Sequence, residues 1–254
     1  MRRDVLDLRA FYASPLGAAA RAMISAKVEE AWGSVQGLDV LGLGYATPFL
    51  GRARGARRIV AAMPAAQGVE AWPDPARNLA CLTDEASLPF PPALFDRVLA
   101  VHALEESGDP LSVMHEVCRV LSPQGRAIVA VTARHSLWAH AESTPFGHGR
   151  PFTRRQLETL IGDAELEPTG WTRALYLPPV RWASGWADGA EQLGAKLWPG
   201  FAGLILMEAI KPVFALRPQG KAARARVFAP VMAPVGQANR GQARSPLGGN
   251  AGSS

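Results

Sequence analysis

The residues of this chain that could bind or transform a ligand share one feature: each stands where an apolar, strand-like run ends. They are Gly42 and Gly44, Met63, Asp84 and Glu85, and His102. Glycine lets a backbone approach a ligand closely, carboxylates bind polar groups, and histidine can hold or take a proton near neutral pH. Parallel strands end at one edge of a sheet, so we expect these residues to line a single ligand-binding crevice.

The segment 36–49 is the one around which we expect the fold to be organised. Its first residues are apolar at the density of a buried strand, and Gly42-Leu43-Gly44 then predicts a sharp turn. Pro48 fits the first turn of a following helix, where its missing N–H costs nothing. A strand, a glycine turn and a helix in this order direct free backbone N–H groups and the positive end of a helix at a small ligand.

The rest of the chain alternates strand-like and helix-like stretches. We expect strands at 58–63, 79–82, 96–103 and 125–132, the last entered through a turn at 122–125, and Asp109 with Pro110 predicts the cap and first turn of a helix. Residues 171–177 and 202–210 predict two antiparallel strands with a helix at 185–197 between them. Strands that are apolar on both faces and alternate with helices predict a doubly wound α/β fold: a mostly parallel, seven-stranded sheet with helices on both faces.

The N-terminal stretch predicts two helices over residues 5–32, separated at Pro15. We expect residues 1–34 to form a helical lid, with Tyr12 beside the break closing over the ligand. The alternative is that Tyr12 is a packing residue. Residues 1–216 are predicted to form one domain, and 217–254 a basic, disordered tail, because that tail is rich in Pro, Gly, Ala and Ser.

Residues 136–150 form a polar and aromatic loop that is longer than most connections, which favours a role in binding. Glycines flank His148 and Arg150 follows, so we expect these two residues to contact a substrate that enters beneath the loop. The neighbouring His135, His140 and Glu142 do not have the spacing of a zinc site, and no metal is predicted. Thr153 predicts the cap of a helix that follows the loop.

The charge pattern gives no strong nucleic-acid signal in the folded part. The net charge is +5, but residues 217–254 hold six basic and no acidic residues, which leaves residues 1–216 close to neutral. A weak contact of the tail with nucleic acid or an anionic membrane surface is the alternative to a solvated tail. We see no membrane span and no signal peptide, and Cys81 and Cys118 are expected to be free thiols, so we predict a cytoplasmic location.

Five short motifs stand in one order along the chain. They are the glycine motif at 38–46, Asp84-Glu85, LPF at 88–90 followed by FDRV at 95–98, HALE at 102–105, and RVLSPQGR at 119–126. Together they resemble the motifs of the class I S-adenosylmethionine-dependent methyltransferases of the methyltransferase type 11 kind. The resemblance covers roughly residues 11–216 and implies a Rossmann-like fold.

The resemblance also implies a cofactor and a reaction: S-adenosylmethionine, whose methyl group passes to an unidentified acceptor. The residues that it places near the cofactor are Tyr12, Gly42, Gly44, Ala46, Met63, Asp84, Glu85 and His102. His102 stands at the strand end where a base for the acceptor would lie; a cofactor contact and a wall histidine are the other readings.

Two positions depart from the family's pattern. Val40 stands where an acid precedes the first glycine, and Asp39, one residue away, would point to the opposite face of the strand. Met63 stands where an acid holds the ribose hydroxyls, and Glu70 is the nearest later acid. Losing that contact would weaken cofactor binding by about 1.5–3 kcal/mol, or roughly ten- to a hundredfold.

These departures motivate a second hypothesis, a methyltransferase-like module that binds a partner without catalysis. An apolar patch at Trp182, Trp186 and Trp198 would favour it. A nicotinamide-dependent dehydrogenase fits less well, because Thr47 stands at the third glycine position of its motif and the acid about 20 residues later is missing.

Overall fold

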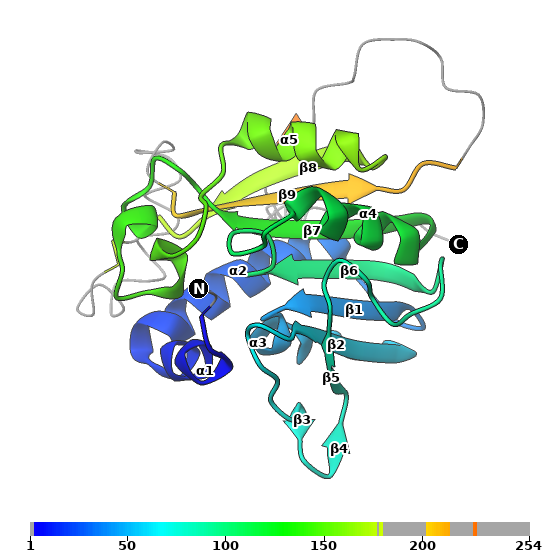
Figure 1. Cartoon of the computed structure of the whole chain (residues 1–254), viewed down its shortest axis with the longest axis horizontal. Coiled ribbons are helices and arrows are strands. Elements are labelled where there is room, and N and C mark those ends of the chain that lie inside the picture. The colour runs from blue at the N-terminus through cyan, green and yellow to red at the C-terminus, as the bar shows by residue number, and fades with distance from the viewer. Residues whose placement is uncertain (1–2, 177, 180–201, 214–225, 228–254) are drawn as a thin grey trace, which may run out of the picture.

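The structure is a computed structural model that describes residues 3–176, 178–179, 202–213 and 226–227 (Figure 1). Its main body is one twisted sheet with helices on both faces. The helix predicted at 185–197 and the patch predicted at Trp182, Trp186 and Trp198 lie outside the described residues.

The elements follow the predicted order with small shifts at their ends. The helices are α1 (Val5–Ala13), α2 (Pro15–Trp32), α3 (Thr47–Leu50), α4 (Pro110–Val120) and α5 (Arg154–Asp163), with the short 3-10 helices η1 (Leu137–His140) and η2 (Pro145–Gly147). The strands are β1 (Asp39–Gly44), β2 (Arg58–Pro64), β3 (Pro73–Asp74), β4 (Arg77–Asn78), β5 (Ala80–Thr83), β6 (Phe95–Val101), β7 (Leu121–Thr132), β8 (Glu167–Ala174), β9 (Leu204–Ile210) and β10 (Arg226–Val227). The hairpin of β3 and β4 was not predicted.

The main sheet has the strand order β10-β8-β9-β7-β6-β1-β2-β5. Strands β5, β2, β1, β6 and β7 are parallel to one another, and β9 is antiparallel to both β7 and β8. The predicted mostly parallel, seven-stranded sheet is confirmed, with the two-residue β10 added beside β8 from within the segment predicted to be a disordered tail. The predicted pair of antiparallel strands is confirmed, since β8 and β9 pair antiparallel with each other and β9 pairs antiparallel with β7. Because β7 and β8 both run opposite to β9, β8 runs in the same direction as β7.

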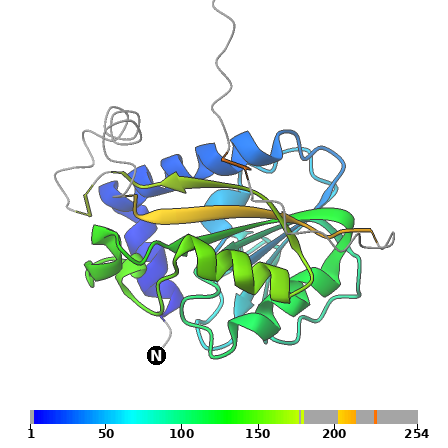
Figure 2. The same ribbon diagram turned by 90° about the horizontal axis from the view of Figure 1, so that it is seen from above.

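The helices cover the two faces of this sheet, with α2 on one face and α4 and α5 on the other (Figure 2). Each face has its own apolar core, and neighbouring residues of one strand contribute to different cores. Val40 packs in the core on the α2 side and Leu41 in the core on the α4 side, and both are fully buried. Val40 is therefore part of the core under α2, which explains why an apolar residue suits this position.

Local signals set the helix ends where the sequence predicts them. The Asp109 carboxylate accepts hydrogen bonds from the N–H groups of Leu111 and Ser112, both at 3.2 Å, and α4 begins at Pro110. Thr153 caps α5 in a reciprocal capping box with Gln156. These contacts satisfy backbone donors that the first turn of a helix leaves unpaired.

The turn predicted at 122–125 is a bulge within β7. Phe95 of β6 pairs with Leu121, but Arg97, two residues later, pairs with Arg126. The extra residues of β7 leave the sheet and return, with Gln124 at a φ of +62°. The RVLSPQGR motif therefore shapes the amino-terminal end of β7, far from the carboxyl edge.

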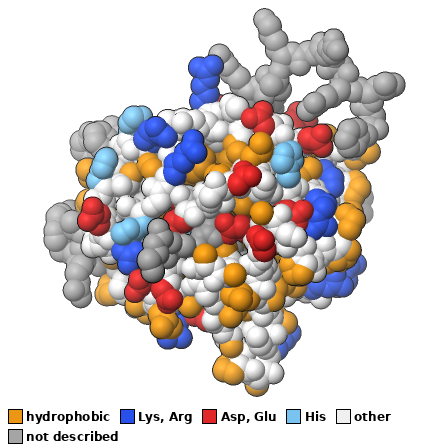
Figure 3. All heavy atoms as spheres, in the orientation of Figure 1, with side chains coloured by type: hydrophobic (Ala, Val, Ile, Leu, Met, Phe, Trp, Pro, Cys, Tyr) orange, Lys and Arg blue, Asp and Glu red, His pale blue; other side chains and the backbone are white. Residues whose placement is uncertain are grey.

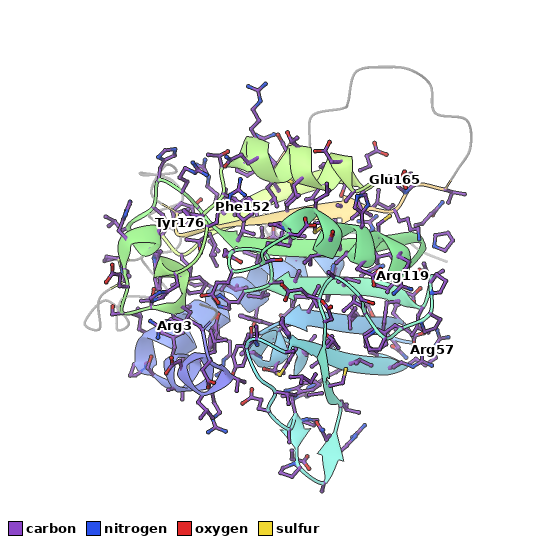
Figure 4. The ribbon with its side chains drawn as sticks, in the orientation of Figure 1. Arg3, Arg57, Arg119, Phe152, Glu165 and Tyr176 are labelled. Carbon is purple, nitrogen blue, oxygen red and sulfur yellow. The ribbon has the colours of Figure 1, made fainter. Side chains whose placement is uncertain are left out.

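Arg119 and Glu116 of α4 join two of the sequence motifs at this amino-terminal edge. The Arg119 guanidinium donates to the carbonyl oxygens of Phe90 and Leu88, at 2.8 and 2.9 Å, and to both carboxylate oxygens of Glu116, at 2.7 Å. Glu116 in turn accepts the Leu88 N–H at 2.7 Å. Figure 4 shows Arg119 and Arg57 at the end of the sheet opposite Arg3. These hydrogen bonds hold the LPF and RVLSPQGR motifs together, and we call this arrangement the clasp.

At the other end, Gly44 of β1 pairs in register with Val101 of β6. Gly44 has a φ of +81°, and a Cβ added there would lie 2.2 Å from the carbonyl oxygen of Val101. That same oxygen accepts the N–H of Tyr45 at 2.8 Å. Only glycine combines this backbone conformation with this approach, so Gly44 fixes where β1 ends relative to β6.

We expect Glu116→Gln to lower the free energy of unfolding by about 1–3 kcal/mol at pH 7, because it breaks a charged hydrogen-bond network. The Arg119 guanidinium holds the pKa of Glu116 below its ordinary value of 4.5. The stabilisation is therefore complete above pH 4.5 and is lost as the pH falls through the lower, folded-state pKa. Urea unfolding at several pH values measures this, with Glu158→Gln, which breaks a partly exposed ion pair within α5, as the control. Equal losses for both variants would contradict the clasp.

We expect Gly44→Ala to destabilise the fold by at least about 2 kcal/mol, since alanine is strained in the left-handed region and its methyl group would overlap the Val101 oxygen. The matched control is Gly51→Ala, where φ is −59° and an added Cβ meets nothing within 4 Å. That variant should change stability by less than about 0.5 kcal/mol. Similar midpoints of chemical unfolding for the two variants would show that the contact is unimportant.

Candidate functional site

The carboxyl ends of β1, β2, β5 and β6 meet at one edge of the sheet, where α1 and residues 136–150 also lie (Figure 1). The predicted site residues of these strands reach this edge, but the glycines lie inside β1 rather than in a turn after it. The chain turns at Tyr45 and Ala46, and a Cβ added at Gly42 would lie 2.8 Å from the Ala46 Cβ. The helix that follows, α3, has only four residues, so it directs a weaker dipole at the edge than the sequence suggested.

Tyr12 and His102 form a buried hydrogen-bonded pair at this edge. The Tyr12 hydroxyl lies 2.8 Å from His102 Nε2, and the two side chains are 5 % and 9 % exposed. His102 directly follows β6 with a φ of +52°, a conformation that few residues other than glycine adopt. Because Val101 contacts Gly44, the strained His102 is held next to the glycine segment. The structure thus brings Tyr12, Gly44 and His102 together.

Aromatic rings surround this pair. Tyr12 stacks on Tyr45, with ring centroids 5.8 Å apart and 21° between the planes, and meets Phe49 edge-on at 5.6 Å. Phe146 of the 136–150 loop lies 4.9 Å from the His102 ring and 5.8 Å from Phe11. The rings come from α1, the end of β1, α3, the end of β6 and the loop, so one aromatic cluster joins these five segments.

The end of β2 carries two polar residues that were not among the predicted cofactor contacts, Gln67 and Glu70. Gln67 is 2 % exposed, and its Nε2 donates to the carbonyl oxygen of Gly44 at 3.5 Å, while its Oε1 has no hydrogen-bond partner. The Glu70 carboxylate accepts from the Thr47 hydroxyl at 3.2 Å, and its N–H lies 3.5 Å from the sulfur of the fully buried Met63. The irregular segment 65–72 gives no periodicity from which these contacts could be inferred.

At the end of β5, the two acidic residues Asp84 and Glu85 have different surroundings. Asp84 is exposed, and its carboxylate accepts the N–H of Ala86 at 2.9 Å, so it closes its own turn. Glu85 is half-buried. Thr83, the last residue of β5, directly precedes this acidic pair. It is 5 % exposed, and its hydroxyl oxygen has no hydrogen-bond partner. Thr83 pairs in register with Pro64, which places it beside the start of the Gln67 segment.

The two predicted substrate contacts, His148 and Arg150, point to different surroundings. His148 Nε2 contacts the Arg3 guanidinium and lies 2.7 Å from the Glu142 carbonyl oxygen. Arg150 is exposed, and its guanidinium lies 5.8 Å from the centroid of the Phe152 ring. It lines a groove of about 520 Å³ between the start of α4 and α5. His148 therefore fastens the loop to the chain's N-terminal residues, and Arg150 belongs to a neighbouring surface.

Glu105, the last residue of the HALE motif, ties the site's segments together. Its carboxylate accepts the Thr132 N–H at 3.0 Å, and its carbonyl oxygen accepts the Arg150 N–H at 2.6 Å. A Cβ added at Gly149, where φ is +75°, would lie 2.5 Å from that carbonyl oxygen. Glu105 thus fixes the 136–150 loop against the ends of β6 and β7, a role that its place in the motif could have indicated.

Burial sets the protonation of the two tyrosines. Desolvation, with the nearby Tyr45 and Glu105, raises the pKa of Tyr12 well above its ordinary value, and desolvation together with Glu70 raises the pKa of Tyr45. Both are therefore neutral phenols at physiological pH and can donate a hydrogen bond. Within the described ranges, no group of three or more His, Cys, Asp or Glu side chains is arranged to hold a metal ion.

The surface over α4 and α5 carries acidic and basic side chains interspersed with apolar ones (Figure 3). A surface of mixed sign does not attract one kind of charged partner over a long range. Among the described helices, none is long and apolar enough to cross a bilayer.

Comparison with known proteins agrees with this fold. Residues 38–129 match the family model described as "Methyltransferase domain". No match to a curated protein sequence was found.

Several solved structures with the same fold are methyltransferases of low sequence identity. An S-adenosylmethionine-dependent methyltransferase from Thermotoga maritima, a possible histamine N-methyltransferase, is 18% identical over 81% of this chain and 92% of its own, with a TM-score of 0.54. A chain of the Haloferax volcanii complex between the Trm112 methyltransferase activator and the putative methyltransferase is 20% identical to this chain. The match covers 84% of this chain and 100% of that one, with a TM-score of 0.57. An S-adenosylmethionine-dependent methyltransferase from Mesorhizobium loti is 14% identical over 79% and 99%, with a TM-score of 0.52.

The domain match covers the strands that carry the glycine segment, the acidic pair and His102, and the neighbours share the sheet that brings them together. Residues 38–129 are therefore similar to a methyltransferase domain, and the chain has the fold of S-adenosylmethionine-dependent methyltransferases.

Proposed function

We propose that this chain binds S-adenosylmethionine at the carboxyl edge of its sheet and transfers the methyl group to an acceptor. The observation that carries the proposal is a pair of buried oxygen atoms without a hydrogen-bond partner, Gln67 Oε1 and Thr83 Oγ1. An unpaired buried polar atom costs about 1–3 kcal/mol. A ligand with hydroxyl and amino groups recovers that energy, and the adenosine part of the cofactor has both.

The position of Gln67 supports this assignment. Its N–H donates to the Pro64 carbonyl oxygen at 2.9 Å, so the side chain starts within one turn of the end of β2. Its Nε2 faces the carbonyl of Gly44, which leaves Oε1 as the acceptor. The family resemblance places an acid for the ribose hydroxyls at the end of β2, where this chain has Met63. Gln67 Oε1 supplies the acceptor that a methionine lacks.

Glu70 supplies a negative charge at the same corner. Its carboxylate contacts Thr47, and it raises the pKa of the Tyr45 hydroxyl, so it stands beside the residues that follow the glycine segment. A carboxylate in this place can accept hydrogen bonds from ribose hydroxyls or attract the cationic sulfonium. The irregular segment 65–72 thus replaces the missing acid of β2 with two residues farther along the chain.

S-adenosylmethionine supplies an electrophilic methyl group when it is bound, and the protein chiefly orients the two reactants. The backbone at Gly44 and Tyr45, together with Gln67, Glu70 and Thr83, would hold the cofactor. His102, at the end of the neighbouring strand, would accept a proton from an acceptor that must lose one. Asp84 is engaged in its own turn, so Glu85 is the better candidate of that pair for a cofactor contact.

The alternative is a methyltransferase-like module that binds a partner without methyl transfer. Val40 and Met63 favour it, because both are fully buried apolar residues where the family resemblance expects acids.

Three further predictions come from the sequence: the lid formed by residues 1–34, the domain boundary at residue 216 and the cytoplasmic location.

We expect calorimetric titration with S-adenosylmethionine and S-adenosylhomocysteine to show binding in the micromolar range. Gln67→Met keeps the shape of the side chain and removes the acceptor oxygen. It should weaken both ligands about tenfold, the equivalent of one hydrogen bond of about 1.4 kcal/mol. Glu70→Gln should weaken binding by a similar factor.

The matched control is Gln156→Met, because the side chain of Gln156 bonds Thr153 in the capping box of α5. This variant should bind both ligands with unchanged affinity. No detectable binding by the folded wild-type protein at millimolar ligand would overturn the proposed function and leave the binding module as the better explanation. Binding that Gln67→Met leaves unchanged would reject the role of Gln67 alone.

A further inference from the structure

One of the buried polar side chains at the carboxyl edge belongs to α1, not to the sheet. The Tyr12 ring lies between Tyr45, on which it stacks, and Phe49, which it meets edge-on, with its hydroxyl 2.8 Å from His102 Nε2. These three residues line what we call the aromatic slot. Two of them belong to the segment after β1 and one to the end of β6, so the slot exists without α1, and a phenol from α1 fills it.

The aromatic slot lies where an acceptor must be. Tyr45 directly follows the glycine segment proposed to hold the cofactor, and His102 is the proposed base. These two segments are joined by the contact of Gly44 and Tyr45 with the Val101 carbonyl. An acceptor that gives its proton to His102 and meets a methyl group held at the glycine segment must therefore occupy the volume that the Tyr12 ring fills.

α1 is attached so that it can withdraw. It has nine residues, a length at which an isolated helix is marginal, and a break at Ser14 separates it from α2. Polar contacts hold its start: the Arg3 N–H donates to Glu106 at 2.7 Å, and the Val5 N–H donates to the Gln67 carbonyl at 2.9 Å. Opening α1 exchanges these hydrogen bonds for bonds to water, exposes the buried side chains of Val5 and Leu8, and empties the aromatic slot.

We propose, on the basis of the proposed methyl transfer, that the acceptor is a small phenol, and that it binds in the aromatic slot when α1 withdraws Tyr12. Tyr12 then acts as a placeholder that keeps the slot shaped and dry until the phenol replaces it. The geometry of the replaced side chain defines the ligand: a flat ring against Tyr45 and Phe49, with its hydroxyl on His102 Nε2.

The reaction in this slot balances without a further reactant. The phenol hydroxyl gives its proton to His102 Nε2, and its oxygen forms a bond to the methyl carbon of S-adenosylmethionine. The bond from that carbon to sulfur breaks, and its electron pair remains on sulfur in S-adenosylhomocysteine. The products are an aryl methyl ether and an imidazolium, which returns its proton to water.

The chemistry of the slot favours a phenol over other acceptors. A phenol ionises near pH 10, far more readily than an aliphatic alcohol, so a histidine can take its proton as the oxygen attacks. The described walls are aromatic, which suits a flat ring and not a highly charged molecule.

The test uses p-cresol, the free equivalent of a tyrosine side chain, and toluene, which has the same ring and methyl group without the hydroxyl. Binding is measured by calorimetry without cofactor on the full chain, the wild type beside Tyr12→Ala, Tyr12→Phe and Phe11→Ala. We expect Tyr12→Ala to bind p-cresol at least tenfold tighter than the wild type does, and tenfold tighter than it binds toluene. Phe11→Ala, which loosens α1 but leaves Tyr12 in place, should gain less than threefold.

Replacing His102 distinguishes a slot that recognises the phenol hydroxyl from a cavity that accepts any ring of the same size. Adding His102→Gln to Tyr12→Ala should remove most of the preference for p-cresol over toluene. If Tyr12→Ala does not fold, Tyr12→Phe serves the same purpose, because it removes the hydroxyl that lies 2.8 Å from His102 Nε2, and it should bind p-cresol at least threefold tighter than the wild type. An equal affinity for p-cresol and toluene in the folded Tyr12 variants would overturn the proposal.

Methyl transfer is tested separately, so that the two proposals can fail independently. Wild-type protein and Tyr12→Phe are incubated with S-adenosylmethionine and p-cresol, and 4-methylanisole is measured by mass spectrometry. We expect the ether with both proteins and at least a hundredfold less with His102→Gln. Cofactor binding without any ether would overturn the phenol as acceptor and leave the proposed function standing. No cofactor binding by calorimetry would overturn the proposed function itself.

Discussion

The site depends on the close contact between Gly44 and the carbonyl oxygen of Val101. It brings the end of β1 against the end of β6 and so places His102 next to the glycine segment. Any side chain at position 44 would push the strands apart where the ligand must bind. The contact also explains why Gly44 lies within β1 rather than in a turn. A glycine here lets the backbones of β1 and β6 approach each other, and the chain turns one residue later.

The sequence motifs divide into two groups that lie at opposite ends of the sheet. Arg119 and Glu116 hold the backbone of Leu88 and Phe90 at the amino-terminal edge, where no ligand is proposed to bind. The glycine segment and the HALE motif lie at the carboxyl edge. The motifs that identify the fold most readily therefore stabilise it, while the cofactor assignment rests on residues such as Gln67 that belong to no motif.

The carboxyl edge is closed by the protein's own side chains. Tyr12 and Phe146 join the rings of the sheet edge, and Glu105 and Arg3 hold the loop and the start of α1 in place. A closed edge protects the buried polar atoms Gln67 Oε1 and Thr83 Oγ1 from water without pairing them. The same closure requires α1 to move before a ligand can enter, so binding at this edge and the position of α1 are energetically linked.

The sequence by itself determined most of the elements and their order, though not the β3–β4 hairpin or β10. Capping residues, prolines and apolar runs act over a few residues, so α1, α2, α4, α5 and the central strands could be predicted from short stretches such as Asp109-Pro110. The tertiary structure alone decided the contacts of the site. Tyr12 meets His102 across 90 residues of chain, and Thr47 meets Glu70 across 23. It also decided that β8 runs parallel to β7, and that Asp84 closes its own turn. Such contacts arise where packed strands end and irregular segments fold back on them, and no local periodicity records which segments will meet there.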